Sequence, residues 1–428
     1  MDMTLTKPLT RWAVFATALL VSAGTALTGW RHGRAEYHAA SRSPDEWLRA
    51  AEEEPSNPEN WHRLGTYYAL DFEHADPPRA ISYLQRAVSL DPASPYDWTD
   101  LAEAYESVGD VADAEKSFHA AQSAYPISAD VAWRFGNFLM RQNRLDEAFR
   151  EIQQAVTVKP DLAPLAISRC WRSTRDVDRL LGSALPATPD VYWAALDFFV
   201  KTSEPDAVTA TWHRIVGAGA PFQLPDAFPA VDMLIASGHS DDAKTVWQEA
   251  LAATHTPPQY APPGSLIWNG GFEYELLNGG LAWHYQPVQG AILGFDEEAP
   301  HSGDRSLRIL FDGTANVDFE ALWQNVPVEA NTRYRFQAYV RADQITTDSG
   351  IRFAVIDLSP QPIPQQFTSN TIGTQPWSLV DLDFVTGPET RALRVIIQRP
   401  PSARLGNKIQ GSVWIDDVSL VPLQRGAP

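Results

Sequence analysis

Three hydrophobic patterns follow one another along the chain, and each predicts a different kind of element. Residues 12–30 form a run of nineteen residues without a charge. From residue 44 to residue 253, apolar residues recur at the spacing of amphipathic helices. From residue 266 onward, short segments alternate between apolar and polar residues, as strands with one buried face do. The sequence therefore predicts a multidomain chain that is helical first and all-β at its end.

The uncharged run has the length of a membrane span. Nineteen residues at about 1.5 Å each extend about 28 Å, which is close to the thickness of a bilayer core. Trp12 and Trp30 stand at its two ends, where aromatic side chains suit the membrane interfaces. Small residues around 23–26 also fit a cleaved signal peptide, and a soluble amphipathic helix is a third alternative. We expect a tail over 1–11 and an anchor or signal over 12–30. The body is then exported to the periplasm or the cell exterior, and secreted if the segment is cleaved.

Pairs of helices repeat through residues 44–160. One unit places its large and small residues at these positions: Trp98, Leu101, Ala102, Tyr105, Ala114, Phe118, Ala121 and Pro126. The pattern recurs 34 residues later. It also occurs once before this unit, and there a longer turn at 71–78 separates the two helices. It resembles the tetratricopeptide repeat. The resemblance implies an α-solenoid of helical hairpins whose groove binds a protein partner.

Small residues at matching positions explain how paired helices would approach closely. Gly65 and Gly136 are two of them.

Surface carboxylates such as Asp97, Asp100 and Glu103 predict a solvated helix face or, alternatively, an acidic groove for a basic peptide.

The repeat pattern decays after Pro160, so residues 161–253 are expected to form divergent helical repeats. Hairpins can be placed at Tyr192–Val216 and at Phe228–Ala253. The lone cysteine, Cys170, lies in an apolar helical stretch and is expected to be an inert packing residue. A stretch rich in proline and glycine, 254–265, predicts a linker.

Residues 266–424 predict a two-sheet β-sandwich. Its apolar positions alternate with polar ones in four segments: Leu307, Ile309 and Phe311; Tyr334, Phe336, Ala338 and Val340; Val380, Leu382 and Phe384; Leu393, Val395 and Ile397. The segment opens with Asn269-Gly270-Gly271-Phe272-Glu273 and closes with Trp414-Ile415-Asp416-Asp417-Val418-Ser419-Leu420.

These two strings resemble the ends of a carbohydrate-binding module of the CBM4/9/22 type, a galactose-binding-like jelly roll. Ser302-Gly303 before Leu307 resembles a turn of that family, and residues 323–336 resemble its central hairpin. The resemblance implies a structural calcium ion near the two ends of the domain. Its candidate ligands are Glu273, Asp416 and Asp417, completed by carbonyls of the 301–305 turn. Alternatively, these carboxylates accept backbone N–H bonds or pair with arginine.

Glycan binding would require exposed aromatic rings with planar polar groups beside them. The candidates are Tyr285, Trp323, Tyr339, Arg341, Arg352 and Gln398. Trp283 and Trp377 are expected in the core instead. The alternative is that the sandwich is only a packing module.

The net charge and the absence of known catalytic motifs exclude several classes of function. The net charge is −19, while the first forty residues carry +2, so the body repels nucleic acid. Catalytic motifs of metalloproteases, α/β-hydrolases and nucleotide-binding enzymes are absent from the sequence. We therefore expect a non-enzymatic, membrane-anchored scaffold of the bacterial envelope, whose repeats bind a protein and whose sandwich binds a polysaccharide, in exopolysaccharide assembly or export. The alternatives are a pure protein assembly factor and an accessory or cryptic glycoside hydrolase.

Overall fold

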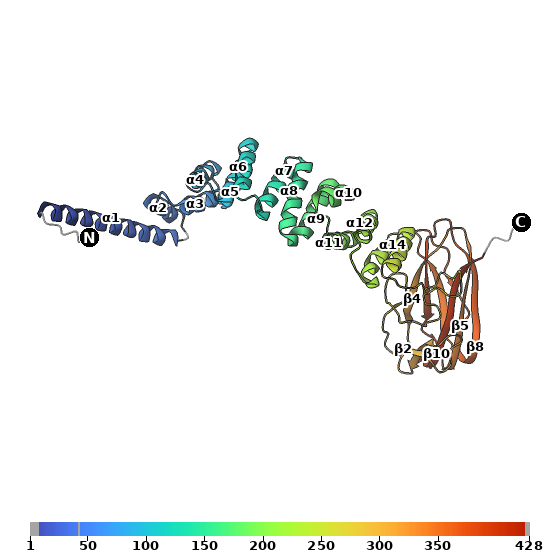
Figure 1. Ribbon diagram of the computed structural model, residues 1–428. Coiled ribbons are helices and arrows are strands. Elements are labelled where there is room, and N and C mark those ends of the chain that lie inside the picture. The colour runs from blue at the N-terminus through green and yellow to red at the C-terminus, as the bar shows by residue number, and fades with distance from the viewer. Residues whose placement is uncertain (1–7, 42, 424–428) are drawn as a thin grey trace, which may run out of the picture. The chain divides into compact units, whose positions relative to one another are not determined.

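The computed structural model describes residues 8–41 and 43–423. It divides into two compact units, residues 1–186 and 187–428. Residues 1–7 of the expected tail, and residue 424 at the expected end of the sandwich, lie outside the described residues. Each unit is described by itself (Figure 1).

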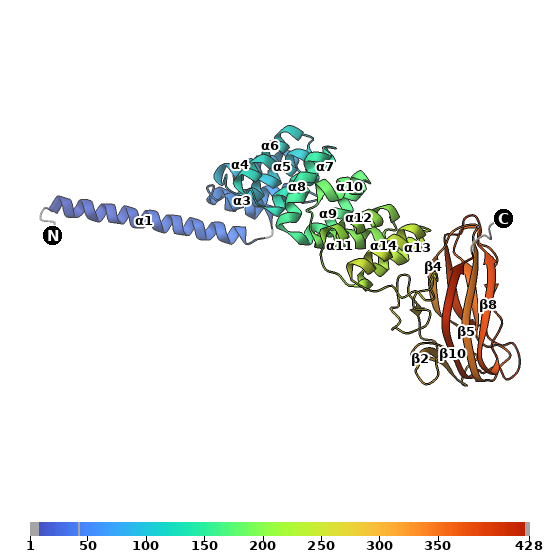
Figure 2. The same cartoon turned by 45° about the vertical axis from the view of Figure 1, so that its right-hand side comes forward.

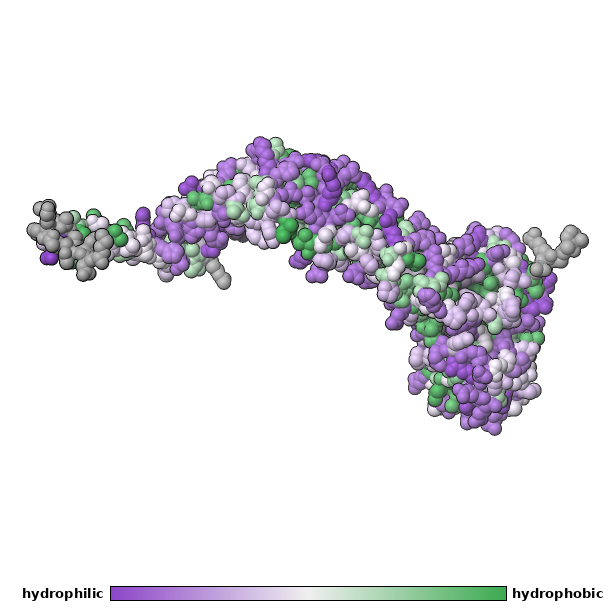
Figure 3. Space-filling model, in the orientation of Figure 1, coloured by the Kyte–Doolittle hydropathy of each residue, from purple (hydrophilic) through white to green (hydrophobic). Residues whose placement is uncertain are grey.

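Helix α1 spans Pro8–Ala39, so it begins before and ends after the predicted segment 12–30. Residues 31–39 contain no proline, and a single glycine does not end a helix. Within the described chain, Arg11–Ala39 is the helix long and apolar enough to cross a membrane, by length and composition alone. Apolar side chains are visible on its surface in Figure 3. Its last turns pack on α2, where Ala35 is buried and His32 Nδ1 lies 3.0 Å from Glu54 Oε1.

The first unit continues as helical hairpins, as predicted. Its elements are α2 (Pro44–Glu53), α3 (Pro58–Leu70), α4 (Pro77–Leu90), α5 (Pro95–Ser107), α6 (Val111–Ala124), α7 (Ala129–Arg141), α8 (Leu145–Val158), η1 (Pro160–Leu162), α9 (Ala163–Thr174), α10 (Val177–Arg179) and η2 (Leu180–Ala184). The longer turn expected between α3 and α4 is present as residues 71–76. After α9, the short elements α10 and η2 replace a full second helix, which explains why the repeat pattern is unclear there.

Side-chain packing in the hairpins follows the predicted use of small residues. A Cβ placed on Gly65 would lie 2.5 Å from Leu84 Cγ, and one on Gly136 would lie 2.9 Å from Ile152 Cδ1. Larger residues at these positions would push the paired helices apart. Cys170 is fully buried, and burial raises the pKa of its thiol to about 12, so the thiolate is disfavoured.

Two further hairpins open the second unit, at the positions expected from the sequence. They are α11 (Pro189–Lys201) with α12 (Pro205–Ala218), and α13 (Phe228–Ala236), preceded by η3 (Leu224–Ala227), with α14 (Ser240–Ala253). The described part of the second unit then continues as the β-sandwich.

The sandwich consists of two antiparallel five-stranded sheets, which confirms the predicted fold class (Figure 2). The first sheet has the order β1-β4-β9-β6-β7 and the second has the order β2-β3-β10-β5-β8. The strands are β1 (His284–Tyr285), β2 (Ala291–Asp296), β3 (Ser306–Asp312), β4 (Phe319–Pro327), β5 (Arg333–Ile345), β6 (Arg352–Asp357), β7 (Gln366–Phe367), β8 (Gly373–Val385), β9 (Ala392–Arg399) and β10 (Gln410–Pro422).

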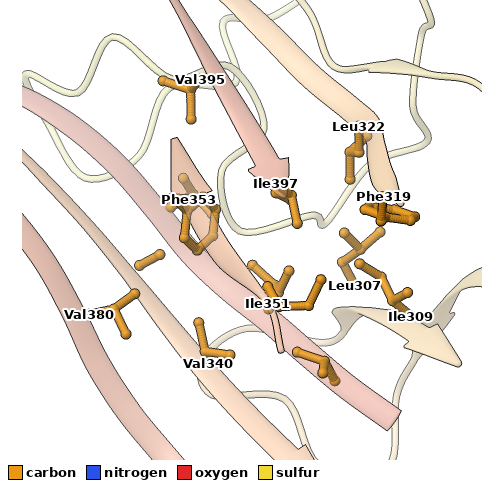
Figure 4. Close-up of a cluster of buried hydrophobic side chains, with 14 of the residues drawn as sticks. Leu307, Ile309, Phe319, Leu322, Val340, Ile351, Phe353, Val380, Val395 and Ile397 are labelled. Atoms are coloured by element: carbon orange, nitrogen blue, oxygen red, sulfur yellow. The ribbon is translucent and has the colours of Figure 1, made fainter. Parts of the chain in front are cut away.

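The apolar sides of both sheets meet in one core, as the alternating pattern predicted. Leu307, Val340, Phe353, Val395 and Ile397 from the two sheets point toward one another there (Figure 4). The expected central hairpin over 323–336 is wrong, however. Strand β4 pairs with β1 and β9, whereas β5 pairs with β10 and β8, so these consecutive strands lie in opposite sheets.

The two strings that bracket the domain do meet. The closing string lies on β10, with a bulge between Asp416 and Ser419. The opening string is a turn, because Asn269 and Phe272 have left-handed backbone conformations. The Val418 N–H donates to Gly270 O at 2.9 Å. A Cβ on Gly270 would lie 1.9 Å from Val418 O, so this approach requires a glycine.

The hairpin α13–α14 packs directly on the sandwich within the second unit. A Cβ on Gly279 would lie 2.2 Å from Phe228 Cδ2, and one on Gly280 would lie 2.7 Å from Trp247 Cζ3. Trp247 and Trp268 are buried and meet edge to face, with ring centroids 5.2 Å apart. The irregular segment that precedes β1 is therefore packed against the hairpin α13–α14.

Candidate functional site

An aromatic and apolar row crosses the outer face of the sheet β1-β4-β9-β6-β7. Strand register places five residues side by side in this row: His284, Trp323, Ile396, Ala354 and Phe367. We call this set the aromatic row. The His284 and Trp323 rings stack with centroids 5.3 Å apart, and Phe367 is 38% exposed. Because side chains alternate along a strand, the row faces away from the core.

Planar polar groups border the aromatic row on one side. Arg352 and Gln398 are register partners there, and Arg352 Nε donates to Gln398 Oε1 at 3.1 Å. Gln398 in turn donates to Glu320, and the Arg352 guanidinium lies 4.1 Å from the ring centre of Phe367. Two of the predicted polar candidates therefore share the sheet face of the predicted Trp323.

A second polar border lies on the other side of the aromatic row. Asn325 and Arg394 are register partners, and Arg394 Nε donates to Asn325 Oδ1 at 2.9 Å. The Arg394 guanidinium also lies 5.8 Å from the ring centre of Trp323. Sequence reasoning missed Asn325 and Arg394, although both alternate with core residues along their strands and therefore face away from the core.

The structure separates the remaining glycan candidates from this face. Tyr285 is on β1 but packs against the sandwich core. Tyr339 and Arg341 lie on β5 in the opposite sheet. The Tyr339 ring is covered by His301, with centroids 3.5 Å apart, while Arg341 lies 4.6 Å above Trp414.

Trp283 is buried as expected, but the expectation of a core position for Trp377 is wrong. Trp377 is partly exposed, and its Nε1 donates to Ala299 O at 3.2 Å. It lines a cavity of about 470 Å³ together with Arg341 and Asp343. The second sheet therefore has an aromatic surface of its own, but its rings are largely engaged by neighbours.

The three candidate calcium ligands gather around one glycine. The place where Gly271 would carry a Cβ lies 3.8 Å from Glu273 Cγ and 3.9 Å from Oδ1 of both Asp416 and Asp417. Asp416 Oδ2 accepts the N–H groups of His301 and Ser302 at 2.9 and 3.1 Å. Burial, and then the nearby Asp417 charge, raise the pKa of Asp416 to about 6.

Hydrogen bonds already engage the other two carboxylates of this cluster. Glu273 accepts the Asp304 N–H at 3.1 Å, and Asp417 contacts the His301 ring and the Ser302 hydroxyl at 2.6 and 2.7 Å. Among the described residues, no group of three or more His, Cys, Asp or Glu side chains has a metal-binding arrangement. The oxygen-only donor set suits a hard cation, and the carboxylates lie together at the 301–304 turn. Calcium at this place stays a prediction.

The repeats of the first unit carry paired charges. Asp100 lies 2.6 Å from His62 Nε2, and Arg134 donates to both Asp100 and Glu103. The hydrogen bond that His62 donates to Asp100, helped by the Asp97 charge, raises the pKa of His62 against the effect of its burial. These carboxylates are therefore partnered within the solenoid and do not form an open acidic groove.

A basic cavity lies further along the repeats. It has a volume of about 500 Å³ and is lined by Asn137, Met140, Arg141, Arg169, Arg172 and Ser173. Arg169 donates to Asn137 Oδ1 at 2.6 Å and lies over the Trp133 ring. Arg141 is already paired with Glu106 at 2.6 Å, so the positive charge left in the cavity comes from Arg169 and Arg172.

Comparison with known proteins supports the reading of the repeats. Residues 99–164 match the family model of the tetratricopeptide repeat, which confirms that prediction for this segment. Superkiller complex protein 3 of Mus musculus is 28% identical over 162 residues, which are 37% of this chain and 10% of the mouse protein. The Homo sapiens protein is 31% identical over the same length. The chain thus spans about a tenth of the length of these curated relatives.

Solved structures similar to this chain include a match to its helices and matches to its sandwich. The crystal structure of MamA is 15% identical and covers 50% of this chain and 86% of its own, with a TM-score of 0.25. A family 16 carbohydrate-binding module is 18% identical and covers 36% of this chain and 99% of its own, with a TM-score of 0.27. A CBM4 structure is 14% identical and covers 37% of this chain and 99% of its own, with a TM-score of 0.28. The sandwich assignment above rests on the strands, their order and their common core.

Proposed function

We propose that this chain is a non-enzymatic, membrane-anchored scaffold of a bacterial envelope. Its α1 helix holds it in the membrane, its repeats bind a protein partner, and its sandwich binds a polysaccharide outside the cytoplasm. Exopolysaccharide assembly or export is the process that such a combination would serve.

The aromatic row is the observation that carries the glycan part of this proposal. Phe367 and part of Trp323 are exposed in this row, so the C–H faces of sugar rings can pack on them, while Ile396 and Ala354 between them are buried and support the rings from within. Hydrogen-bonding groups stand on both sides, namely Gln398 and Arg352 on one and Asn325 and Arg394 on the other. A row that crosses several strands suits an extended chain of sugars better than a single small molecule.

The basic cavity of the repeats supports the protein-binding part. In a body with strong net negative charge, Arg169 and Arg172 would favour an acidic or carboxylate-bearing segment, whereas Arg141 is already paired with Glu106. Structural calcium at Glu273, Asp416 and Asp417 belongs to this proposal as a stabiliser of the sandwich. When bound, it would tie the 269–273 turn and the 301–304 turn to β10.

The experiment is affinity electrophoresis of the full chain in detergent through gels that contain a panel of polysaccharides. We expect at least one glycan to retard the protein. Trp323→Ala should weaken that binding about tenfold or more, since a central aromatic residue commonly contributes over 1.4 kcal/mol. Trp377→Ala, on the opposite sheet, is the matched control and should bind as the wild type does.

Two outcomes would contradict the glycan assignment. Unchanged mobility of the wild type on a broad panel would leave the pure assembly factor as the better account. Equal losses in both tryptophan variants would remove the aromatic row from the site. Release of reducing ends from the same glycans would instead favour the glycoside hydrolase alternative.

A further inference from the structure

A cavity lies between helix α13 and the outer face of the first sheet, inside the second unit. Its volume is about 350 Å³, within the range of about 300–1,000 Å³ typical of small-molecule sites. Its walls come from both parts of the unit: Asp232, Ile235 and Ala236 from α13, and His284, Trp323, Asn325, Leu358 and Arg394 from the sandwich. The cavity thus continues the aromatic row at Trp323 and is closed on one side by a helix.

Asp232 brings one unpartnered carboxylate oxygen, Oδ1, into this cavity, although its side chain as a whole is 41% exposed. Its Oδ1 atom is out of contact with water and accepts no hydrogen bond among the described residues. The His284 ring is close by, with Nε2 3.8 Å from Asp232 Oδ1 and 3.0 Å from Gly280 O. Burial raises the pKa of Asp232, and the neighbouring His284 opposes that rise. A buried acceptor of this kind is costly unless something binds to it.

Arg394 supplies the complementary donors. Its Nε is engaged by Asn325, while its two terminal nitrogens donate no hydrogen bond within the described chain. Burial lowers the pKa of Arg394, and the Asp232 charge opposes that effect. The cavity therefore presents one free acceptor and free donors, beside the amide of Asn325 and the ring of Trp323.

This combination selects a neutral, polyhydroxylated ligand. A carboxylate accepts from one hydroxyl and a guanidinium donates to another, so adjacent hydroxyls of a sugar ring would satisfy both. An anionic sugar would be repelled by Asp232 and a cationic amine by Arg394. The apolar neighbours Ile235 and Leu358 suit the C–H groups of the same ring.

We propose that α13 forms a wall of the glycan site, and that Asp232 together with Arg394 binds adjacent hydroxyls of a neutral sugar. This inference rests on the proposed glycan-binding function and deepens it, because it assigns to a helix of the repeats a direct role in recognition. The sandwich alone would then hold an incomplete site.

The test uses the full chain in detergent and the polysaccharides that retard it, sorted into neutral and uronate-containing ones. Asp232→Ala should weaken binding to the neutral glycans about tenfold or more. Asp232→Asn keeps an oxygen acceptor and most of the shape, so it should retain part of that affinity and guards against a variant that fails to fold. Asp241→Ala, an exposed carboxylate on the next helix, is the control and should leave binding unchanged.

The outcomes separate this inference from the function on which it rests. If Trp323→Ala loses binding while both Asp232 variants bind as the wild type does, the glycan site stands but α13 is no part of it. If the ligands are uronate polymers and Asp232→Ala binds them more tightly, the assignment to a neutral sugar is overturned. If the wild type binds none of the glycans, the proposed function fails and this inference fails with it.

Discussion

Replacing Gly279 by alanine tests how tightly the last helical hairpin is joined to the sandwich. The new Cβ would lie 2.2 Å from Phe228 Cδ2 and 2.7 Å from Phe228 Cγ. The 278–281 segment, or the start of α13, would have to move by about 1 Å to restore ordinary contact. Phe228 has little room to yield, because it is 8% exposed and packs against Trp247.

The expected loss of stability is about 1–3 kcal/mol, the usual cost of overpacking a well-filled core. For a unit of this size, each kcal/mol lowers the Tm by roughly 2–4 °C. Gly279→Ala should therefore lower the Tm of the second unit by roughly 2–12 °C in calorimetry. Asn278 and Gly280 hold Tyr285 and His284 through hydrogen bonds of 2.8 and 3.0 Å, so the displaced segment should also disturb the glycan cavity.

Gly294→Ala is the matched control. Gly294 lies on β2, and a Cβ there would meet nothing within 4 Å. Its effect should stay within about 0.5 kcal/mol, as for other surface substitutions. If Gly279→Ala unfolds at the same temperature as this control, the helical hairpin is not packed on the sandwich as described, and the wall formed by α13 loses its support.

Two further predictions concern the sandwich itself. Calcium at a hundred times its Kd should stabilise the wild type by about 2.7 kcal/mol and so raise its Tm. Asp416→Asn should abolish this increase. An unchanged wild-type Tm on adding excess chelator would contradict the calcium site. Arg399→Met should cost about 3 kcal/mol or more in urea unfolding, because fully buried Arg399 donates to Asn316 Oδ1 at 2.8 Å and to Ser349 O at 3.1 Å. Exposed Arg404, paired with Asp348 at 3.0 Å, is the control, and an equal effect of Arg404→Met would refute the argument.

The sequence predicted the elements well wherever one periodicity ran without interruption. Gly65 and Gly136 revealed where paired helices cross, because a repeat places the same packing need at the same position each time. Alternation along β3, β5, β8 and β9 likewise revealed the core, since only one face of each strand is buried. Both predictions depend on local spacing alone.

Pairings between distant segments could not be predicted in this way. Alternation tells which face of a strand is buried, but not which sheet the strand joins, so β4 and β5 were wrongly expected to form a hairpin. For the same reason Arg352, Gln398 and Trp323 could not be separated from Tyr339 and Arg341. Register alone brings the first three to one face and sends the other two to the opposite sheet.

Local sequence patterns also fail to predict which parts of the chain fold together at the boundary between the helices and the sandwich. Proline and glycine in 254–265 predict a linker, and a linker usually marks the edge of an independent domain. Yet Phe228 and Trp247 from the helices fill space that Gly279 and Gly280 leave open. A change of composition marks where the backbone changes its structure, whereas side-chain packing decides what folds together. A fragment cut within 254–265 would lose both this packing and Asp232, so weak glycan binding by that fragment would reflect an incomplete site.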